Sequence, residues 1–374
     1  MRVSIDCRYL RERPSGIGAY VQALVDRLPA RARDVQFHFW ASPMASRPLS
    51  REPNVEETVV AVEANHVPTL AWPSLLLPID DADVVHMPYN VLGRGIRAST
   101  VVTVHDLMWL LTPSRCEASA WRRAYQTPFY RAGIRMALRH ATRIVAISRA
   151  TADAIVRAHP AALGRVRVIH HGVEARYAPA SDEGEARAVC ERAGVSGPFF
   201  LAMGQNAPYK NHAAVLEAFA AARLPEDVRL VFVQRLSPRG ELALRARQLG
   251  LGERVVWVSA AGPDLALALL QSALGLVQFS LEEGFGMPAL EAMACGTPVI
   301  VSDTPALTEV VERAGLRVAL GEAGALSRAM SRLAREPSLR AELRGLGLER
   351  ARAFDWDACA LQHLEVYREA AAAR

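Results

Sequence analysis

The stretch SLEEGFGMPALEAMACGTPV, residues 280–299, is the part of the chain that indicates the fold class most directly. It follows a short apolar run at residues 275–278, turns through two glycines and enters an apolar helical pattern at Pro288, a residue favoured in the first turn of helices. A second β-branched run, residues 298–301, closes the stretch. Strand, glycine turn, helix and strand in this order are typical of a parallel α/β sheet.

Short β-branched runs alternate with longer amphipathic segments along the whole chain, which predicts an α/β protein with parallel sheets. Further strands are expected at residues 3–6, 35–40, 84–86, 100–104, 143–147, 166–170, 199–203, 229–233 and 255–258. Further helices are expected at residues 19–28, 122–141, 150–158, 213–222, 263–273 and 322–336, with an Ala-rich one at 359–374.

The length of 374 residues is that of two domains rather than one. The turn-rich segment APASDEG, residues 178–184, is the expected boundary. We predict two doubly wound, Rossmann-like domains, residues 1–178 and 179–355, that face each other across a cleft. Ligands are expected at the carboxyl ends of strands in that cleft.

Composition excludes several classes of protein. With 44 basic and 39 acidic residues, the formal charge of +5 is too small and too dispersed for a dedicated nucleic-acid binder. The five cysteines lie far apart and form neither a zinc pattern nor a disulfide framework, which fits a reduced cytoplasm. Every apolar stretch is too short or too interrupted to span a bilayer.

The glycine turn of residues 280–299 is suited to binding an anion. Gly284 and Gly286 allow a ligand to approach the backbone closely, and the next helix offers amide donors at its positive end. Beside such a site, Glu283 and Glu291 are suited to binding sugar hydroxyls. From these residues alone an alternative has equal weight, in which Glu291 complements the helix dipole and Glu283 is solvated.

On these residues the chain resembles the retaining glycosyltransferases of family 4, which have the GT-B fold. The resemblance rests on the Glu-x7-Glu stretch with its GFG and EAMACGTPV segments, and it extends over nearly the whole chain. The supporting motifs are GIGAY at 16–20, VHDL at 104–107, IS at 147–148, HGV at 171–173, PYKN at 208–211 and FDW at 354–356. It also implies that a final helix, residues 356–374, crosses back onto the first domain.

The resemblance implies a role for each matching residue. Glu283 would contact hydroxyls of the transferred sugar, and Glu291 would contact the ribose of the nucleotide. Lys210, the only lysine of the chain, would neutralise the leaving diphosphate in the place of a metal. His105 would stand near the reacting carbon, so His105, Lys210 and Glu283 form the expected catalytic set. The expected substrate-binding residues are Gly16, Gly18, Asp106, Gln205, Asn206, Arg235, Gly284, Phe285, Gly286 and Glu291.

Some positions depart from the family pattern. Gln205 and Tyr209 stand where many members have an arginine, so a cationic contact to phosphate is either missing or supplied by Arg235. A surface role for Arg235 is an equal alternative. Gly16 and Gly18 lack the third glycine of a dinucleotide-binding turn, so a tight turn alone is their alternative explanation.

Two Asp-x-Asp matches lie at residues 81–83 and 355–357, before a strand and at the start of the last helix. Neither looks like a metal site, and no metal or other cofactor is expected. His105 and Asp106 are alternatively a strand-end pair that satisfies loop amides, and Ser148 is expected to cap a helix.

The resemblance therefore implies a metal-independent, retaining hexosyltransferase. The donor would be GDP-mannose or a UDP-sugar, and the acceptor a hydroxyl of a glycan or lipid-linked molecule in cell-surface polysaccharide or lipopolysaccharide synthesis. Alternatives are a nucleotide-sugar epimerase of GT-B architecture, a non-catalytic nucleotide-sugar-binding protein and a nicotinamide oxidoreductase. Against the last, no Gly-x-Gly-x-x-Gly turn opens either domain.

The expected location is the cytoplasm, with reversible contact to the anionic inner face of the membrane. Residues 121–140 interleave five arginines with Trp121, Tyr125, Phe129 and Tyr130, and residues 70–77 form a second apolar segment. A basic amphipathic helix can lie in an anionic interface. The alternative is an ordinary surface helix that packs its aromatic face on its own sheet.

Overall fold

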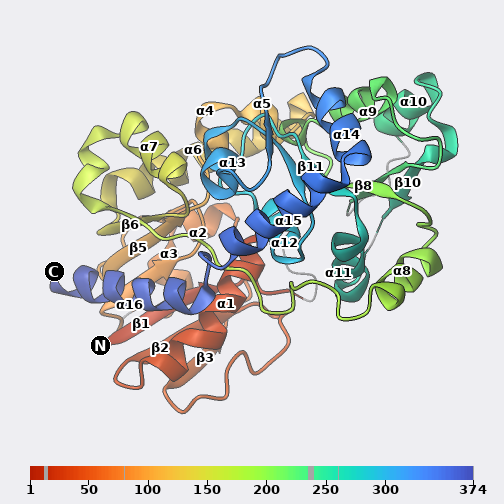
Figure 1. Ribbon diagram of the computed structural model, residues 1–374. Coiled ribbons are helices and arrows are strands. Elements are labelled where there is room, and N and C mark those ends of the chain that lie inside the picture. The colour runs from red at the N-terminus through yellow and green to blue at the C-terminus, as the bar shows by residue number, and fades with distance from the viewer. Residues whose placement is uncertain (12–15, 80, 235–239, 260, 374) are drawn as a thin grey trace. The chain divides into compact units, whose positions relative to one another are not determined.

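The computed structural model describes residues 1–11, 16–79, 81–234, 240–259 and 261–373. The chain forms two compact units (Figure 1). The first unit contains residues 1–114, 119–172 and 355–374, and the second contains residues 115–118 and 173–354. Each unit is built around one parallel sheet, which confirms the predicted class of two Rossmann-like α/β domains.

The sheet of the first unit has the strand order β3-β2-β1-β4-β5-β6-β7. The described strands are β1 (Arg2–Cys7), β2 (Gln36–Ala41), β3 (Val55–Val59), β4 (Val84–Met87), β5 (Ser99–Val104), β6 (Arg143–Ala146) and β7 (Val166–Val168). The central strands β4 and β5 are buried along their whole length, as expected where helices cover both faces of a parallel sheet. The order reverses between β1 and β4, the position at which such sheets bind ligands.

Helices of the first unit connect these strands and cover them. They are α1 (Gly16–Arg31), α2 (Val67–Ala71), α3 (Pro73–Leu76), α4 (Met108–Leu111), α5 (Pro113–Cys116, at the junction of the units), α6 (Ala120–His140), α7 (Arg149–Ala158) and the 3-10 helix η1 (Pro160–Arg165). Ser148 caps α7 by accepting a hydrogen bond from the amide of Thr151 at 3.0 Å, which confirms its predicted capping role.

The last helix, α16 (Trp356–Ala372), packs in the first unit against α1 and against β4 and β5 (Figure 1). The Asp355 carboxylate caps it by accepting from the amides of Asp357 and Ala358. Gly172 lies against the start of this helix, because a Cβ atom there would stand only 2.2 Å from the amide nitrogen of Trp356. The glycine of the HGV motif therefore makes room for the returning chain.

The second unit repeats the same topology with the order β10-β9-β8-β11-β12-β13. Its described strands are β8 (Phe199–Met203), β9 (Arg229–Val233), β10 (Val255–Val258), β11 (Gly275–Gln278), β12 (Val299–Ser302) and β13 (Leu316–Val318). Its helices are α8 (Glu183–Arg192), η2 (Pro208–Lys210), α9 (His212–Ala221), α10 (Glu241–Gln248), η3 (Gly252–Arg254), α11 (Pro263–Ser272), α12 (Met287–Ala294), α13 (Pro305–Val311), α14 (Ala325–Arg335) and α15 (Pro337–Ala351). The order reverses between β8 and β11.

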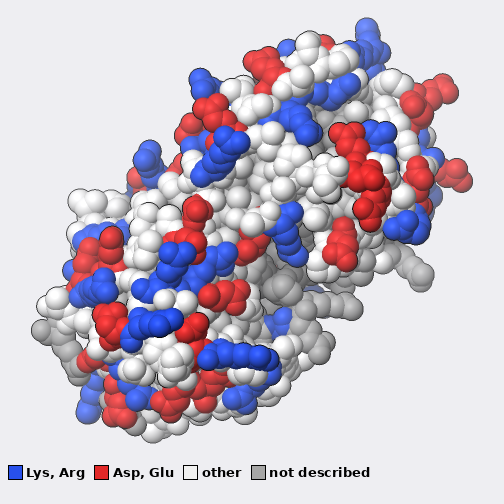
Figure 2. Space-filling model, turned by 60° about the horizontal axis from the view of Figure 1, so that its bottom comes forward, with Lys and Arg blue, Asp and Glu red and all other residues white. Residues whose placement is uncertain are grey.

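Basic and acidic side chains are interspersed over the face shown in Figure 2, with no single-sign field across it. Among the described residues, no helix is both long and apolar enough to cross a membrane.

Candidate functional site

Two loops meet at the switch point of the second sheet. One follows β8 and leads through Gly204 to Lys210, and the other follows β11 and leads to the start of α12. The amide of Leu281 donates a 2.7 Å hydrogen bond to the carbonyl oxygen of Tyr209 and so ties the two loops together. This contact places the predicted residues Lys210 and Glu283 side by side.

Glu283 is the centre of the site. One of its carboxylate oxygens, Oε1, accepts three hydrogen bonds, from Lys210 Nζ at 2.7 Å, Gln278 Nε2 at 2.8 Å and Ser280 Oγ at 2.6 Å. The side chains of Lys210 and Glu283 are each only 9% exposed. The other oxygen, Oε2, has no hydrogen bond to a described residue and is not enclosed. It is therefore available to a ligand hydroxyl.

Lys210 is held by backbone as well as by charge. Gly204 has φ +125°, a backbone conformation that favours glycine, and a Cβ atom there would stand 3.1 Å from Lys210 Cε and crowd the lysine stem. Burial disfavours the charged form of Lys210, but the adjacent Glu283 carboxylate and Tyr209 outweigh burial and raise the pKa above its ordinary value. Lys210 is therefore charged at neutral pH.

The start of α12 is shaped by the GFG segment. Gly286 has φ +121°, and a Cβ atom there would stand 2.5 Å from Leu307 Cδ2. Gly284, Phe285 and Gly286 are all buried, and the Phe285 ring packs edge-on against Phe354. The helix begins at Met287 rather than at the expected Pro288, which leaves Glu291 beyond the first turn. There the carboxylate does not complement the helix start, so the dipole alternative for Glu291 is wrong.

Glu291 instead contacts the segment that leads into the second unit. Its carboxyl group hydrogen-bonds the hydroxyl of Tyr177, and Arg176 also donates to that hydroxyl at 3.1 Å. Burial raises the pKa of Glu291 to about 7, although Tyr177 and Arg176 oppose the shift. The carboxyl group can thus change its charge near neutral pH.

Two of the other predicted contacts, in the loop after β8, are more exposed. Gln205 and Asn206 are exposed at the end of β8, and Arg235 lies outside the described residues. Sequence reasoning missed His212, which follows the Lys210 loop and accepts a 2.8 Å hydrogen bond at Nδ1 from buried Gln234. Burial, together with the nearby Lys210 charge, lowers the pKa of His212 to about 4, so its ring is neutral.

In the first unit, His105 directly follows β5 and is nearly buried. Its Nε2 donates to the carbonyl oxygen of Pro88 at 3.0 Å, because a carbonyl can only accept. Nδ1 therefore carries the lone pair. Burial lowers the pKa of His105 to about 4 and keeps the ring neutral. Asp106 accepts from the amide of Met108 at 2.9 Å, so it satisfies a loop amide as the alternative proposed.

The ring of His105 belongs to an aromatic cluster that the sequence did not reveal. Tyr20 meets it edge-on with ring centroids 5.3 Å apart, and Tyr20 also lies 4.9 Å from His171. His171 in turn packs on Trp356 at the start of α16. Tyr20 was visible only as the last residue of the GIGAY motif, and nothing in the sequence connected it with His105.

A directed chain of hydrogen bonds runs behind this cluster. His363 Nδ1 donates to the Cys359 carbonyl oxygen at 2.8 Å, so its Nε2 accepts from the Tyr20 hydroxyl at 2.6 Å. Tyr20 then accepts from Thr103, which accepts from His86 Nε2, both at 2.8 Å. The chain ends where the hydroxyl of Tyr367 donates to His86 Nδ1 at 2.7 Å. Burial lowers the pKa of His86 and that of His363, so both rings are neutral.

Gly16 and Gly18 lie in the first turn of α1. Gly16 is exposed, with open space where a Cβ atom would be, and Gly18 is buried. The two Asp-x-Asp matches have structural partners: Asp83 accepts from the amide of Arg2, and Asp357 forms an ion pair with Arg31. Among the described residues, no group of three or more His, Cys, Asp or Glu side chains is placed to hold a metal ion.

Comparisons with known proteins cover both units. The family model described as "Glycosyl transferases group 1" matches residues 192–347, and that described as "Glycosyltransferase Family 4" matches residues 14–177. An "MMP alpha-(1->4)-mannosyltransferase" of Mycolicibacterium hassiacum is 30% identical over 309 residues, which span 78% of this chain and 72% of that protein.

Solved structures show the same fold at low sequence identity. WaaG, "a glycosyltransferase involved in lipopolysaccharide biosynthesis", superposes with a TM-score of 0.76 and 16% identity over 97% of this chain and 99% of that chain. Anabaena HepE in complex with UDP-glucose superposes with a TM-score of 0.73 and 18% identity over 98% of each chain.

Proposed function

Because this chain belongs to the family 4 glycosyltransferases of GT-B fold, we propose that it transfers a sugar from a nucleotide-diphosphate donor to a hydroxyl, with retention and without a metal. The observation that carries the proposal is the arrangement around Glu283. Three donors converge on Oε1 and fix the carboxylate, while Oε2 remains available. A fixed acceptor of this kind suits a sugar hydroxyl, since it needs no reorganisation when the ligand binds.

Leaving-group stabilisation is assigned to Lys210. Its charge stands in a loop at the switch point of the second sheet, where diphosphates bind in related folds. The residues of the glycine turn before α12, Gly284, Phe285 and Gly286, line the same site in this proposal. Glu291 would accept hydroxyl hydrogen bonds from the ribose, with Tyr177 as the group that holds it before the nucleotide binds. Gln205 and Asn206, exposed beside the loop, complete the donor side.

We assign the binding of the acceptor to the first unit. His105 presents a neutral ring beside Asp106 and the start of α1, where Gly16 and Gly18 lie. We place His105 near the reacting carbon. Its Nε2 proton is committed to Pro88, so the ring serves as a positioned dipole and acceptor rather than as an acid. In this scheme the donor phosphate assists the acceptor hydroxyl, and no side-chain base is required.

For the donor we propose GDP-mannose or a UDP-sugar. The Mycolicibacterium relative is named as a mannosyltransferase, and Anabaena HepE was solved with UDP-glucose. The proposed acceptor is a glycan or lipid-linked molecule of cell-surface polysaccharide or lipopolysaccharide synthesis, the process named for WaaG.

A screen of the purified chain against UDP-, GDP-, ADP- and dTDP-sugars tests the proposal. We expect one class to be bound and slowly hydrolysed, and transfer in excess EDTA with the anomeric configuration of the donor kept. An inverted product, or activity that is lost in EDTA and regained with magnesium, would reject the mechanism. A new sugar isomer formed from donor alone would favour the epimerase, and binding without any turnover would favour a non-catalytic protein.

Peripheral contact with an anionic membrane is part of the proposal. Trp121 and Tyr125 at the start of α6 are 76% and 74% exposed, and Arg135 and Arg139 are exposed farther along the same helix. Phe129 and Tyr130, by contrast, pack towards the core. Two aromatic side chains of this helix therefore face the core, and two face solvent. Trp72 and Leu75 add exposed apolar surface in the second predicted segment. Exposed aromatic and basic residues on one helix suit an anionic interface.

A further inference from the structure

The loop after β4 holds His105 at two points. The carbonyl oxygen of Pro88, the first residue after this strand, accepts a 3.0 Å hydrogen bond from His105 Nε2. The Asn90 side chain accepts a 2.7 Å hydrogen bond from the His105 backbone amide through Oδ1. The first contact fixes the tautomer of the ring, and the second fixes the backbone that carries it. The position of His105 therefore depends on where residues 88–90 lie.

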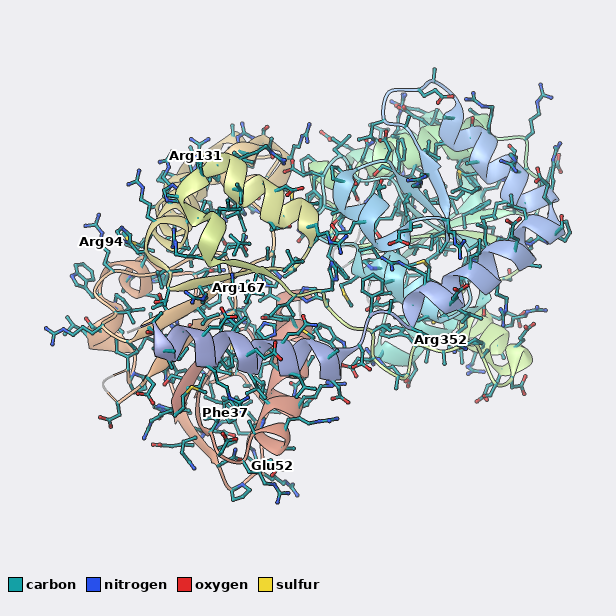
Figure 3. All side chains as sticks on the ribbon, turned by 60° about the vertical axis from the view of Figure 1, so that its left-hand side comes forward. Phe37, Glu52, Arg94, Arg131, Arg167 and Arg352 are labelled. Carbon is teal, nitrogen blue, oxygen red and sulfur yellow. The ribbon has the colours of Figure 1, made fainter. Side chains whose placement is uncertain are left out.

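Tyr89, the residue between these two contacts, is anchored in the core of the first unit. Its side chain is buried, and its hydroxyl donates to Asp6 Oδ2 at 2.6 Å. Asp6 lies in β1, which pairs with β4, and β4 pairs with β5, the strand before His105. Phe37 of β2 and Arg167 of β7, labelled in Figure 3, lie on either side of these three strands in the sheet. The series of contacts thus crosses the centre of the sheet.

Asp6 is itself fixed by Arg8 in a buried ion pair. The Arg8 guanidinium donates to both carboxylate oxygens, from Nε at 2.8 Å and from a terminal nitrogen at 2.5 Å. Its other three N–H groups donate to the Val62 carbonyl oxygen at 2.7 Å and to the Thr69 and Tyr89 hydroxyls, both at 3.3 Å. A buried network in which every donor has an acceptor is rigid and has one preferred arrangement.

The ion pair is too deeply buried to act on a substrate directly. The side chains of Arg8 and Asp6 are 1% and 0% exposed, so any effect on a reaction must pass through the groups that they hold. Burial and the adjacent Asp6 carboxylate raise the pKa of Tyr89, so its hydroxyl remains a donor at neutral pH. The Tyr20 ring also packs on His105, but a ring contact does not determine which nitrogen carries the proton.

We propose that Tyr89 is a positioning residue, which holds residues 88–90 on the Asp6–Arg8 pair and so fixes the ring orientation and the tautomer of His105. The inference rests on the proposed transferase function, in which His105 stands near the reacting carbon. Without the Tyr89 hydroxyl, residues 88–90 can shift, and the Pro88 carbonyl oxygen no longer selects the Nε2–H tautomer. A displaced ring should slow the chemical step more than it weakens donor binding, because the donor is assigned to the second unit.

Tyr89→Phe tests the proposal, because it removes only the hydroxyl. Asp6 keeps its Arg8 donors and both charges stay paired, whereas a substitution of Asp6 or Arg8 would leave an uncompensated buried charge. The matched control is Tyr9→Phe. The Tyr9 ring packs on Tyr89 with ring centroids 4.9 Å apart, and its hydroxyl hydrogen-bonds Asn65.

The first measurement is the tautomer of His105 in the full chain without substrate. Proton–nitrogen correlation spectra of isotope-labelled histidine distinguish the two neutral tautomers, and the signal of His105 among the ten histidines is identified by its loss in His105→Ala. Wild type and Tyr9→Phe should show the Nε2–H tautomer alone, and Tyr89→Phe should show a mixture. The Nε2–H tautomer alone in Tyr89→Phe, or the same mixture in Tyr9→Phe, would overturn the proposal.

The second measurement is the hydrolysis of the nucleotide-sugar that the screen identifies, without acceptor. In Tyr89→Phe, kcat should fall about ten- to a hundredfold while the donor KM stays within about twofold of wild type. Tyr9→Phe should stay within about twofold in both. In a His105→Ala background, Tyr89→Phe should lower kcat less than about twofold further, because its effect passes through His105. An undiminished fall in that background would overturn the proposal.

The two measurements separate this inference from the proposed function. If wild type hydrolyses a donor but neither the tautomer nor kcat responds to Tyr89→Phe, the role of Tyr89 alone is wrong. If the tautomer shifts but kcat does not, Tyr89 is a structural neighbour of His105 and has no part in the reaction. If the tautomer shifts and wild type turns over no nucleotide-sugar, the contacts that hold His105 are supported and the transferase proposal is rejected.

Discussion

Lys210 Nζ lies 2.7 Å from Glu283 Oε1, and the two side chains are almost equally buried. The residues that the sequence suggested for the leaving group and for the sugar are therefore one ion pair. The Glu283 carboxylate favours the charged form of Lys210, so removing either side chain leaves its partner without a counter-charge in a partly dehydrated loop. This pairing changes what substitutions at either position should do.

Replacing Lys210 should reduce both activity and stability. Because Lys210 is paired with the buried Glu283 carboxylate, we expect Lys210→Ala to lower the free energy of unfolding by on the order of 3 kcal/mol. The value of kcat/KM should fall by roughly one to two powers of ten, because a charged hydrogen bond to the leaving group is lost. Chemical denaturation and steady-state kinetics measure the two effects.

A double variant separates the loss of activity from the loss of stability. Lys210→Met combined with Glu283→Gln removes both charges, so stability should return towards wild type while activity stays low. Lys210→Arg should restore little activity, since the lysine stem packs against Gly204 and the wider guanidinium does not fit the same space. Full activity in Lys210→Arg would show that any positive charge suffices.

If the chain contacts an anionic membrane, its binding to vesicles should depend on the charge of the lipid. In flotation with phosphatidylglycerol vesicles at low salt, the wild-type chain should rise with the vesicles and be released by salt, as expected for an interface that adds about 1 kcal/mol per basic residue. Trp121→Ser combined with Tyr125→Ser should lower the bound fraction at least fivefold.

The control is Leu163→Ser, which removes a residue of similar exposure, 68%, from the η1 helix of the same unit. If the wild-type chain ignores lipid charge, or if the control loses as much binding as the double variant, α6 is an ordinary surface helix.

The strands that the sequence predicted best are short runs rich in apolar residues. β8, β9, β10 and β11 were predicted at their observed bounds, although β10 lies at the edge of its sheet. β3 and β13 were missed, because β3 carries two glutamates and β13 has only three residues. Length and apolar composition, rather than position in the sheet, decided which strands the sequence revealed.

The sequence identified individual residues of the site but not the contacts between them. Glu283 and Lys210 were identified from motifs 73 positions apart, but their ion pair depends on how the two loops fold over each other. Tyr20 and His363 are 343 positions apart, and no local pattern connects them.

Glu291 predicts a pH-dependent stability. Its pKa in the folded state is raised to about 7 by burial, whereas an unfolded glutamate titrates near 4.3, so the native state binds more protons between these values. The free energy of unfolding contributed by this group should fall as pH rises from about 4.5 to 7. Denaturation of wild type and Glu291→Gln from pH 5 to pH 8 measures it, with the exposed Glu191→Gln as control.

The Gln variant should lose that part of the slope, which is at most about 1.4 kcal/mol per pH unit, while Glu191→Gln keeps it. Identical pH dependence in wild type and Glu291→Gln would place the pKa of the carboxyl group in its ordinary range.

We expect the hydrogen-bond chain through Tyr20 to hold α16 in place in the first unit. Tyr20→Phe keeps the ring that packs on His105 but removes the hydroxyl, so Thr103 loses its acceptor and His363 Nε2 loses its donor. Two buried groups without partners should cost about 2–4 kcal/mol in the free energy of unfolding. Hydrogen exchange should rise in α16, and kcat should fall less than tenfold because the His105 contact remains. Tyr125→Phe, at an exposed tyrosine on α6, is the control and should change none of these three quantities.

Lowering the pH should reduce stability, as Tyr20→Phe is expected to do. Burial lowers the pKa of His363 to about 4, so the unfolded state binds more protons from about pH 6.5 down to 4, and stability should be lost across that interval. Thr103→Val breaks the same chain, so its effect combined with Tyr20→Phe should be smaller than the sum of the two single effects. Additive effects would mean that the hydroxyls act independently, and a Tyr20→Phe variant as stable as Tyr125→Phe would show that the chain does not hold α16.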